Sequence, residues 1–396
     1  MGAPNRAANE LPLPRVLWSL LFGNFVIGTG VMVVPGTLTD ISDSLQVSVA
    51  TAGQLISAGA LLICLSAPLF AALVAGWDRR RLLALSMLWY GLLHGLCALM
   101  PDFASLLPVR VLTMISPAIF TPQAAACVGL LVPEQQRGRA ITFVFLGWSV
   151  SSVVGMPVGA LLGGLWGWRS AFALVAVLGL ISAVWVWRVM PNGVKPPALS
   201  RAAWRATLQS PALMMCILVT VLYSAGQFVL FAYFAPYYKA ALDITPVQLS
   251  LLFAWFGVFG LIGNVWMSRN IDRVGASRMV MAGVASMALS LAIWPLGTTL
   301  LMAGLVTMPW ALGCFASNSA QQARLVGLAP ALASGSIALN TSAMYAGQAV
   351  GAASGGWLIA QGHMFELHWV GLASLLAAML MSWWATQLAM EAARSK

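Results

Sequence analysis

The stretch SAFALVAVLGLISAVWVWR, residues 170–188, decides the fold class of this chain. It carries no charge before its final arginine, and a helix of about 20 apolar residues spans the hydrocarbon core of a bilayer. Eleven further stretches share this character and fill most of the chain. We therefore expect twelve transmembrane helices, near residues 16–38, 50–75, 82–100, 105–131, 140–165, 170–188, 212–236, 247–268, 277–296, 299–322, 332–360 and 367–390.

The composition excludes several function classes. Only 8% of the residues are charged, whereas a soluble domain carries about 25%. Twelve spans with short loops leave no length for a nucleotide-binding domain. The sequence shows no phosphate-binding loop, and no His/Cys set with metal-ligand spacing. All five cysteines fall within predicted spans. We expect neither an enzyme nor a cofactor.

The net charge of +10 follows the topology of the chain and does not indicate nucleic-acid binding. With an even number of spans both termini lie on one side, and the basic residues concentrate there. The positive-inside rule makes that side cytoplasmic, which predicts a multi-pass protein of the bacterial inner (plasma) membrane. The opposite side carries only Arg169 and Lys239. The cytoplasmic set is Arg6, Arg15, Arg79, Arg80, Arg81, Arg137, Arg139, Arg188, Lys195, Arg201, Arg205, Arg269, Arg273, Arg278, Arg324, Arg394 and Lys396.

The two halves of the chain repeat each other. Polar residues 191–211 form the predicted cytoplasmic linker between an N-terminal six-helix bundle, 1–190, and a C-terminal one, 212–396. The matching features lie 192 to 197 positions apart, and both halves begin on the same face, so the repeat is parallel. The matched features are Asp78-Arg79 with Asp272-Arg273, the glycines 155, 159, 163 and 164 with 347, 351, 355 and 356, and Pro133 and Gly138 with Pro330 and Gly335.

These motifs resemble those of major facilitator superfamily transporters over essentially the full length. The loop Gly76-Trp77-Asp78-Arg79-Arg80-Arg81 is a degenerate copy of the family's motif after helix 2, with Val74 and Arg81 at positions where the family has glycine. The glycine-rich span 5 resembles the drug:proton antiporter branch, and within it the arabinose-efflux-like permeases. The resemblance implies an all-α membrane protein with twelve transmembrane helices in two parallel-repeat bundles that rock about a central site.

The loop motif has two interpretations. Asp78 precedes span 3, where a carboxylate caps a helix and meets its positive end. The resemblance implies that Asp78, Arg79 and Arg80, with Asp272 and Arg273 of the second copy, latch the two halves in the outward-open state. The alternative is that the arginines only anchor the topology.

Span 5 carries small residues for close packing. Gly155 and Gly159 lie four positions apart and share one helix face, and Pro157 removes a backbone hydrogen bond and bends the helix. The resemblance implies that this bend lies at the interface with span 11. Generic packing of small residues is the alternative.

Arg110 is the charged residue that falls inside a predicted span, which makes a functional role the default hypothesis. It matches the arginine of the family's helix 4 motif, although Met114 replaces the glycine that follows. It could hold an anionic substrate group or bias a nearby proton site. Alternatively, it reaches toward the outer surface and pairs with Asp40.

No Asp or Glu falls clearly within a span, which weakens a proton-coupling claim. The remaining protonatable candidates are Asp40, at the end of span 1, and His94 in span 3, which could titrate near neutrality. Their alternative roles are a solvated helix-end acid and a hydrogen-bonded structural histidine.

The other polar residues inside spans suggest a largely uncharged binding cavity. Each of them could equally form interhelical hydrogen bonds. Tyr223 and Gln227 share one helix face, and an aromatic run at 228–238 bounds either the site or the lipid. With Arg110, the substrate-binding candidates are Asn24, Gln123, Tyr223, Gln227, Asn318, Asn340 and Tyr345.

The sequence thus predicts a secondary active transporter that works by alternating access. It would export a small neutral or amphiphilic solute, such as a drug or sugar-like metabolite, in exchange for protons, acting as a monomer in the lipid bilayer without nucleic acid. An uptake symporter or uncoupled facilitator is the alternative, and a non-transporting receptor or scaffold is a remote one.

Overall fold

The computed structural model describes residues 13–74, 76–133, 136–195 and 201–394. These residues are almost entirely helical and include no strand. The helices of the first half are α1 (Leu13–Leu45), α2 (Val49–Ala52), α3 (Gln54–Leu73), α4 (Arg79–Leu99), α5 (Phe103–Thr113), α6 (Ile115–Leu131), α7 (Arg137–Val150), α8 (Met156–Trp166) and α9 (Trp168–Val189).

The second half begins after the helix α10 (Arg201–Leu208), which lies within the predicted linker. Its helices are α11 (Pro211–Phe231), α12 (Phe234–Leu242), α13 (Pro246–Val274), α14 (Ala276–Ala292), α15 (Leu300–Leu328), α16 (Ala333–Ala360) and α17 (Leu367–Arg394).

The prediction of twelve membrane crossings is confirmed. Within the described residues, ten helical segments are long and apolar enough to cross a bilayer. The shorter apolar helix α14 and the 28-residue helix α16 supply the other two.

Besides the second span, which divides at Gly53 into α2 and α3, two spans that the sequence predicts as single helices are interrupted. The fourth span divides into α5 and α6 at Met114, and the seventh into α11 and α12 at Ala232 and Tyr233. At the first interruption the ring nitrogen of Trp89 donates to the carbonyl of Leu112 (3.0 Å). A membrane helix tolerates such a break where a neighbouring helix satisfies the freed backbone groups.

The predicted bend at Pro157 takes the form of a π turn. Residues Ser151–Gly155 join α7 to α8 in π geometry, and the N–H of Met156 donates to the carbonyl of Ser151, five residues back. Since Pro157 has no N–H, the carbonyl of Val153 lacks its usual helical partner. The wider turn accommodates this defect.

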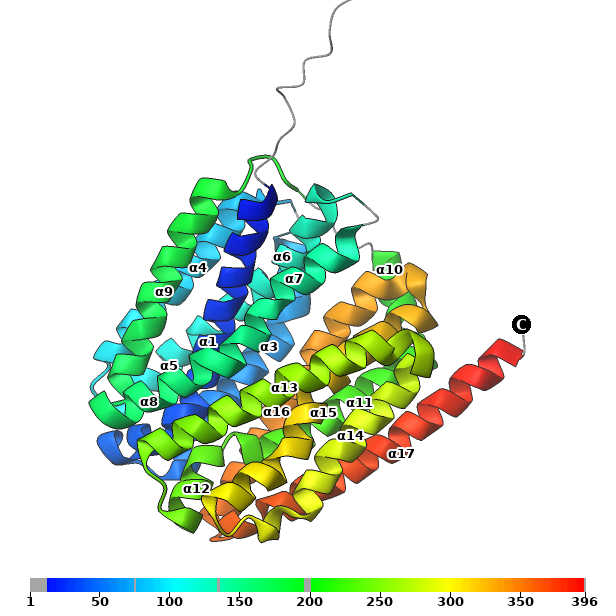
Figure 1. Ribbon diagram of the computed structural model, residues 1–396. Helices are drawn as coiled ribbons and strands as arrows, with labels where there is room; N and C mark the ends of the chain where they lie inside the picture. Colours follow the sequence, from blue (N-terminus) through cyan, green and yellow to red (C-terminus); the bar gives the residue numbers. More distant parts are fainter. Residues whose placement is uncertain (1–12, 75, 134–135, 196–200, 395–396) are drawn as a thin grey trace, which may run out of the picture.

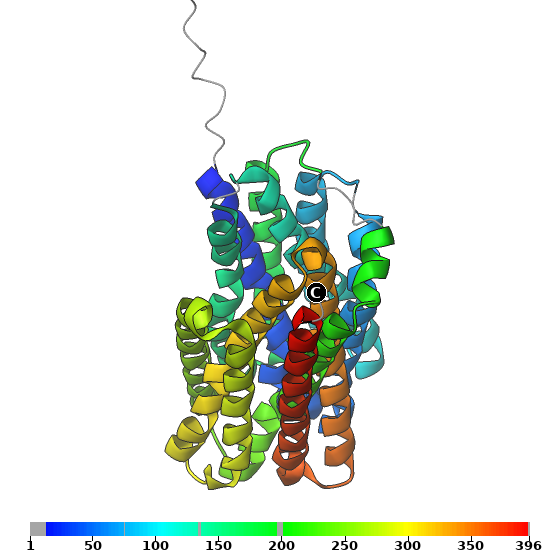
Figure 2. The same ribbon diagram turned by 90° about the vertical axis from the view of Figure 1, so that its right-hand side faces the viewer.

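The helices form two groups that meet at one end and splay apart toward the other (Figure 1). In the first group α1 packs on α7, α8 and α9, and α4 packs on α9; in the second, α11 packs on α16 and α17, and α15 packs on α13 and α14. The two views place α17 on the outside of the second group (Figure 2).

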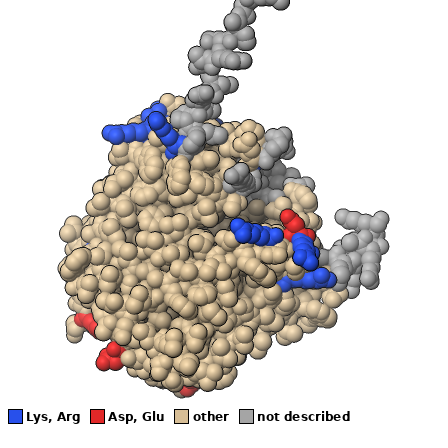
Figure 3. Space-filling view, viewed as in Figure 1, with Lys and Arg blue, Asp and Glu red and all other residues tan. Residues whose placement is uncertain are grey.

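Basic and acidic side chains occupy different parts of the surface. In Figure 3, Lys and Arg lie mainly at the end where the two groups splay apart, with one acidic side chain among them, whereas the other acidic side chains in this view lie along the lower edge. Most of the surface between them carries no formal charge, as lipid-facing helices require.

The two groups touch through two pairs of long helices. The π turn and α8 pack against α13, and α3 packs against α16. Span 5 therefore meets span 8, and span 11 meets span 2. The expectation that the bend of span 5 lies against span 11 is wrong.

Most of the repeated glycines of spans 5 and 11 instead serve packing inside each half, whereas Gly164 contacts Pro246 of the other half. A Cβ on Gly155 would collide with Thr29 of α1, and one on Gly351 would lie 2.4 Å from the carbonyl oxygen of Ala225 in α11. The two glycines, and their two partners, are each 196 positions apart. A stripe of small residues indicates that a backbone approaches closely, but it does not identify the neighbour.

We predict that Gly351→Ala destabilises the protein by about 1–3 kcal/mol, because its methyl group would overlap backbone that cannot move aside. Gly159→Ala is the matched control, since its Cβ would have only an ordinary 3.7 Å contact, with Val33. Thermal unfolding in detergent measures both. Equal loss of stability in the two variants would contradict the packing described here.

Candidate functional site

A central hollow lies between the two halves, with about 330 Å³ of unfilled space when the part open to solvent is included. Helices α1, α3 and the α5–α6 segment line it from the first half, and α11 and α16 from the second. Most of the lining is apolar, including Met32, Met114 and Phe228, and the polar side chains in it are Arg110, Tyr345 and Gln348. Concave, mostly apolar sites with a few polar groups typically bind small molecules.

Arg110 is only 2% exposed and is held by neutral groups. One terminal nitrogen lies 3.0 Å from Nε2 of His94 and 3.4 Å from the Thr113 hydroxyl. The other donates to the carbonyls of Gly30 (2.9 Å) and Val31 (3.4 Å) in α1. The alternative in which Arg110 pairs with Asp40 is wrong, because Asp40 has a different partner, described below.

His94 is fully buried on α4, and its contacts fix its protonation state. Its Nδ1 lies 2.8 Å from the carbonyl oxygen of Tyr90, and its Nε2 faces Arg110. A carbonyl only accepts hydrogen bonds and a guanidinium only donates them. Nδ1 therefore carries the proton, Nε2 accepts from Arg110, and the imidazole is neutral.

Asn24 joins three helices of the first half. It accepts a hydrogen bond from Thr121 of α6 (2.8 Å) and donates one to the carbonyl of Val144 in α7 (3.2 Å). Its amide is fully buried. Asn24 therefore fastens α1 to two neighbours, and its predicted contact with substrate stays a prediction.

Asn340 forms the equivalent junction in the second half. It accepts from Thr220 of α11 (2.6 Å) and donates to Asn318 of α15 (3.2 Å). The corresponding positions of the two junctions are 196 or 197 residues apart. The internal repeat thus extends to buried hydrogen bonds, although the central amide sits on a different helix in each half.

The remaining predicted cavity residues are distributed differently. Tyr345 lines the central hollow. Gln227 accepts from the ring nitrogen of Trp310 (3.4 Å), beside an aromatic cluster of the second half. Tyr223 is buried on α11, and Gln123 is buried on α6. Gln348 also lines the central hollow but was not predicted from the sequence, because its place in the lining depends on how α16 packs against α3 of the other half.

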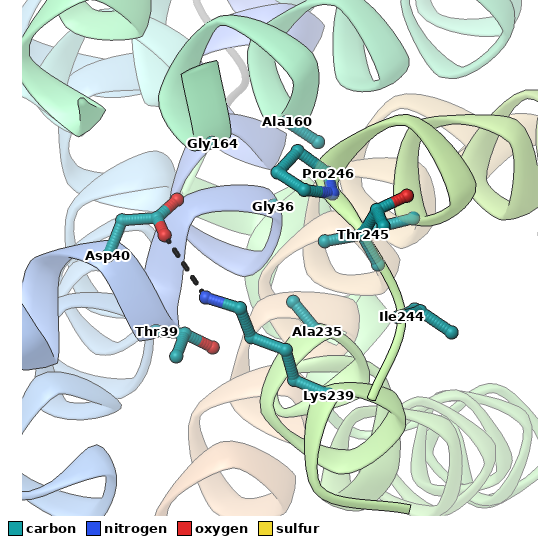
Figure 4. Close-up of a pocket in the computed structure, with 11 residues that line it drawn as sticks. Gly36, Thr39, Asp40, Ala160, Gly164, Ala235, Lys239, Ile244, Thr245 and Pro246 are labelled. Carbon is teal, nitrogen blue, oxygen red and sulfur yellow. Dashed lines mark hydrogen bonds and ion pairs between the residues drawn. The ribbon is translucent and has the colours of Figure 1, made fainter. Parts of the chain in front are cut away.

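The end of the molecule where the halves meet, here called the closed end, contains an ion pair. Asp40 of α1 and Lys239 of α12 lie 3.4 Å apart, with side chains 22% and 37% exposed. They border a second, smaller hollow, the closed-end hollow, into which Figure 4 shows both side chains pointing. Asp40 is therefore an interdomain contact, and Lys239 was recognised in the sequence only as a topological charge.

Apolar and backbone contacts reinforce the closed end. The Ser250 hydroxyl of α13 donates to the carbonyl of Pro157 (3.0 Å), just beyond the π turn. A Cβ on Gly164 would lie 2.4 Å from that of Pro246, so α8 and the start of α13 are in direct contact.

The first copy of the loop motif contacts residues of the first half and of the start of the linker. Asp78 caps α4 by accepting from the N–H of Arg81 (3.3 Å), and it also accepts from the N–H of Gly193 (2.5 Å). Arg79 donates to the carbonyls of Val74 and Trp77. The capping role of Asp78 is confirmed, and the latch role stays a prediction.

The outer members of the motif lie at the surface. Arg80 stacks on the ring of Trp187, with 4.7 Å from guanidinium carbon to ring centre. Asp272 and Arg273 are exposed in the last turn of α13. In the described part of the chain, no cluster of three His, Cys, Asp or Glu residues could hold a metal ion.

Comparisons with known proteins agree with this geometry. The profile of the Major Facilitator Superfamily matches residues 20–241. The inner membrane transport protein YdhP of Escherichia coli is 30% identical over 87% of this chain and 89% of that protein. A chloramphenicol resistance protein of Streptomyces lividans is 32% identical over 69% and 70%, and a probable sugar efflux transporter of Helicobacter pylori 25% over 91% of both.

A solved structure shares the fold. A bacterial homologue of the human lysosomal transporter Spinster, in an inward-facing and unoccupied conformation, superposes with a TM-score of 0.77 at 17% identity, covering 97% of this chain and 99% of that one.

Two equivalent six-helix halves around a central hollow define a polytopic membrane transport protein rather than an enzyme. The chain belongs to the Major Facilitator Superfamily, as the sequence motifs predicted.

We predict that Asp40→Asn and Lys239→Gln each open the closed end slightly. A partly exposed ion pair is worth at most about 1 kcal/mol, so the open population should rise by no more than about fivefold. Labelling of Thr39→Cys, in the wall of the closed-end hollow, by an impermeant maleimide measures this. The exchanged pair Asp40→Lys with Lys239→Asp should restore slow labelling, and its failure to do so would mean that the charges act separately.

Proposed function

We propose that the protein is a secondary active transporter that exports a small neutral or amphiphilic solute, such as a drug or a sugar-like metabolite, in exchange for protons. The observation that supports this most directly is the central hollow, which is apolar and shared by both halves. A solute bound there would contact both halves, so their relative rotation would expose it to one side and then the other.

The closed end supports alternating access as the mechanism. The halves touch through Asp40–Lys239, Ser250–Pro157 and Gly164–Pro246 at that end, and their helices splay apart at the other (Figure 1). We assign the splayed end to the cytoplasm, because the basic residues concentrate there. The structure then represents an inward-open state, with both termini cytoplasmic in an inner membrane.

The two rigid bodies of this mechanism are proposed to be 1–190 and 212–396, joined by the cytoplasmic linker 191–211. The equivalent amide junctions at Asn24 and Asn340 support this division, since each fastens three helices of one half. No contact in the described residues requires a second copy, and we propose that the monomer is the functional unit.

The relatives support the direction and the solute class. Relatives are named for chloramphenicol resistance and for sugar efflux, and both kinds of compound are uncharged. An uptake symporter or an uncoupled facilitator would have the same architecture. Flux measurements distinguish both from a proton-coupled exporter. A receptor or scaffold would show no flux.

Reconstituted protein should carry out counterflow of chloramphenicol or of L-arabinose, with saturation, because a carrier binds its solute in each cycle. An imposed gradient, acidic outside, should make export concentrative, and a protonophore should abolish the concentration step. Flux that survives the protonophore unchanged would indicate facilitation. Absence of counterflow with either probe and with a wider compound panel would contradict transport.

We further predict that Gln348→Leu reduces the thermal stabilisation that the transported probe gives to wild-type protein. Gln348 is one of the few polar side chains facing the solute, and losing one hydrogen bond should weaken binding by roughly three- to tenfold. Val350→Ala is the control, because Val350 lies on the same helix and is 58% exposed. Equal stabilisation in both variants would place the solute elsewhere.

A further inference from the structure

Three groups from three helices form a continuous chain beside the central hollow. His94 on α4 accepts from Arg110 on α5, and Arg110 donates to the carbonyls of Gly30 and Val31 on α1. Both side chains are buried, and Arg110 also lines the hollow. The histidine is therefore connected to α1 through a single guanidinium.

The carbonyls that Arg110 binds lie at a defect in α1. Pro35 is inside this helix, so the carbonyl of Val31, four residues earlier, has no N–H to accept from along the helix. An unsatisfied backbone carbonyl in a membrane is costly. Arg110 supplies the missing donors, and its charge is in turn surrounded by carbonyl dipoles. The guanidinium thus clamps α1 at its weakest point.

The clamp lies close to the closed end. Asp40 follows Pro35 by five residues on the same helix, a rise of about 7 Å. The segment of α1 beyond the proline therefore carries one partner of the Asp40–Lys239 ion pair. A change in the bend at Pro35 would move that partner.

Among the side chains facing this cluster, His94 is the one whose side-chain type titrates near neutral pH in free solution. The others are the phenol of Tyr90 and the thiol of Cys97 on α4, and the phenol of Tyr345 on α16. In the described part of the chain, no carboxylate makes a hydrogen bond or ion pair with His94 or Arg110. At the closed end, the charged groups that interact electrostatically with Asp40 are Lys239 and Asp43.

We propose that His94 is the proton-binding group of the exchange cycle, and that its protonation releases the Arg110 clamp and so weakens the closed end through α1. The inference rests on the proposed proton-coupled transport. Nε2 of His94 accepts one proton from water that enters through the central hollow. Arg110 keeps its own proton, so the cluster gains one positive charge.

Protonation of His94 at Nε2 and the hydrogen bond that Nε2 accepts from Arg110 are mutually exclusive. A protonated imidazole has two N–H donors and no acceptor, so Nε2 cannot bind a proton and accept from Arg110 together. Two cations 3.0 Å apart in a low-dielectric surrounding repel strongly. The clamped, inward-open state therefore favours release of the proton, and protonation favours a state without the clamp.

The protonation state can be tested without any substrate. The chain has three histidines, His94, His363 and His368, so nitrogen-15 histidine spectra of the full protein are simple to assign with H363Q and H368Q. At pH 7 the His94 signal should be that of a neutral ring with its proton on Nδ1. A ring protonated on Nε2, or a cationic ring, would overturn the proposal.

The coupling to the closed end is tested with the Thr39→Cys reporter in wild-type background. Lowering the pH from 8 to 5.5 should accelerate maleimide labelling several-fold, after correction for the fraction of reactive thiolate. His94→Gln should abolish this response, because glutamine can still accept from Arg110 but does not titrate. His363→Gln is the control, since His363 is half exposed and pairs only with Glu366.

The outcomes separate this inference from the transport proposal. A pH response that persists in His94→Gln would assign the proton to another group, such as Asp40, even if flux is proton-coupled. A pH response that disappears in His94→Gln but not in His363→Gln would support release of the Arg110 clamp by protonation of His94. This holds even if neither chloramphenicol nor L-arabinose is transported. If His94→Gln fails to fold, the tautomer of the wild-type ring still decides.

Discussion

The structure depends on one constraint: no backbone N–H or C=O can be left without a partner in lipid. The chain meets it with continuous helices, and at two of the defects a side chain from a neighbouring helix donates a hydrogen bond to the exposed backbone. Arg110 donates to the carbonyls before Pro35, and Trp89 donates to Leu112 at the break between α5 and α6. Ser250 donates to Pro157 from the other half. The interruptions therefore become the points where helices are tied together.

Much of the fold could be predicted because its determinants are local. Apolar length gives each span and recurring motifs give the repeat, and charge asymmetry predicts which side is cytoplasmic. The breaks at Met114 and at Tyr233 each come three residues before a proline, Pro117 and Pro236, so the sequence contained a signal for both that the prediction of single helices did not use. The partner of span 5 was predicted incorrectly, because Gly155 and Gly159 show that something small must face them without saying which helix approaches.

The site shows the same division between local and long-range information. Arg110 and His94 were both conspicuous as polar groups in apolar spans, but their contact depends on how the turn at Asp102 sets α5 against α4. Asp40 was conspicuous as an acid, whereas its partner Lys239 lies 199 positions later and was recognisable only as a loop charge. Asn24 and Asn340 were interpreted as cavity residues, and the structure shows both bonded within their own halves.

The π turn in span 5 has a geometric consequence for the stripe of residues that packs on α1. Gly147, Gly155 and Gly163 all face that helix, yet sixteen residues of regular α-helix would rotate the last about 160° away from the first. One extra residue in the turn sets the rotation back by about 100°, and gentle coiling of the two rods absorbs the rest. The irregular turn thus acts as a phase correction, keeping a seam of small residues aligned over a distance that an ideal helix could not maintain.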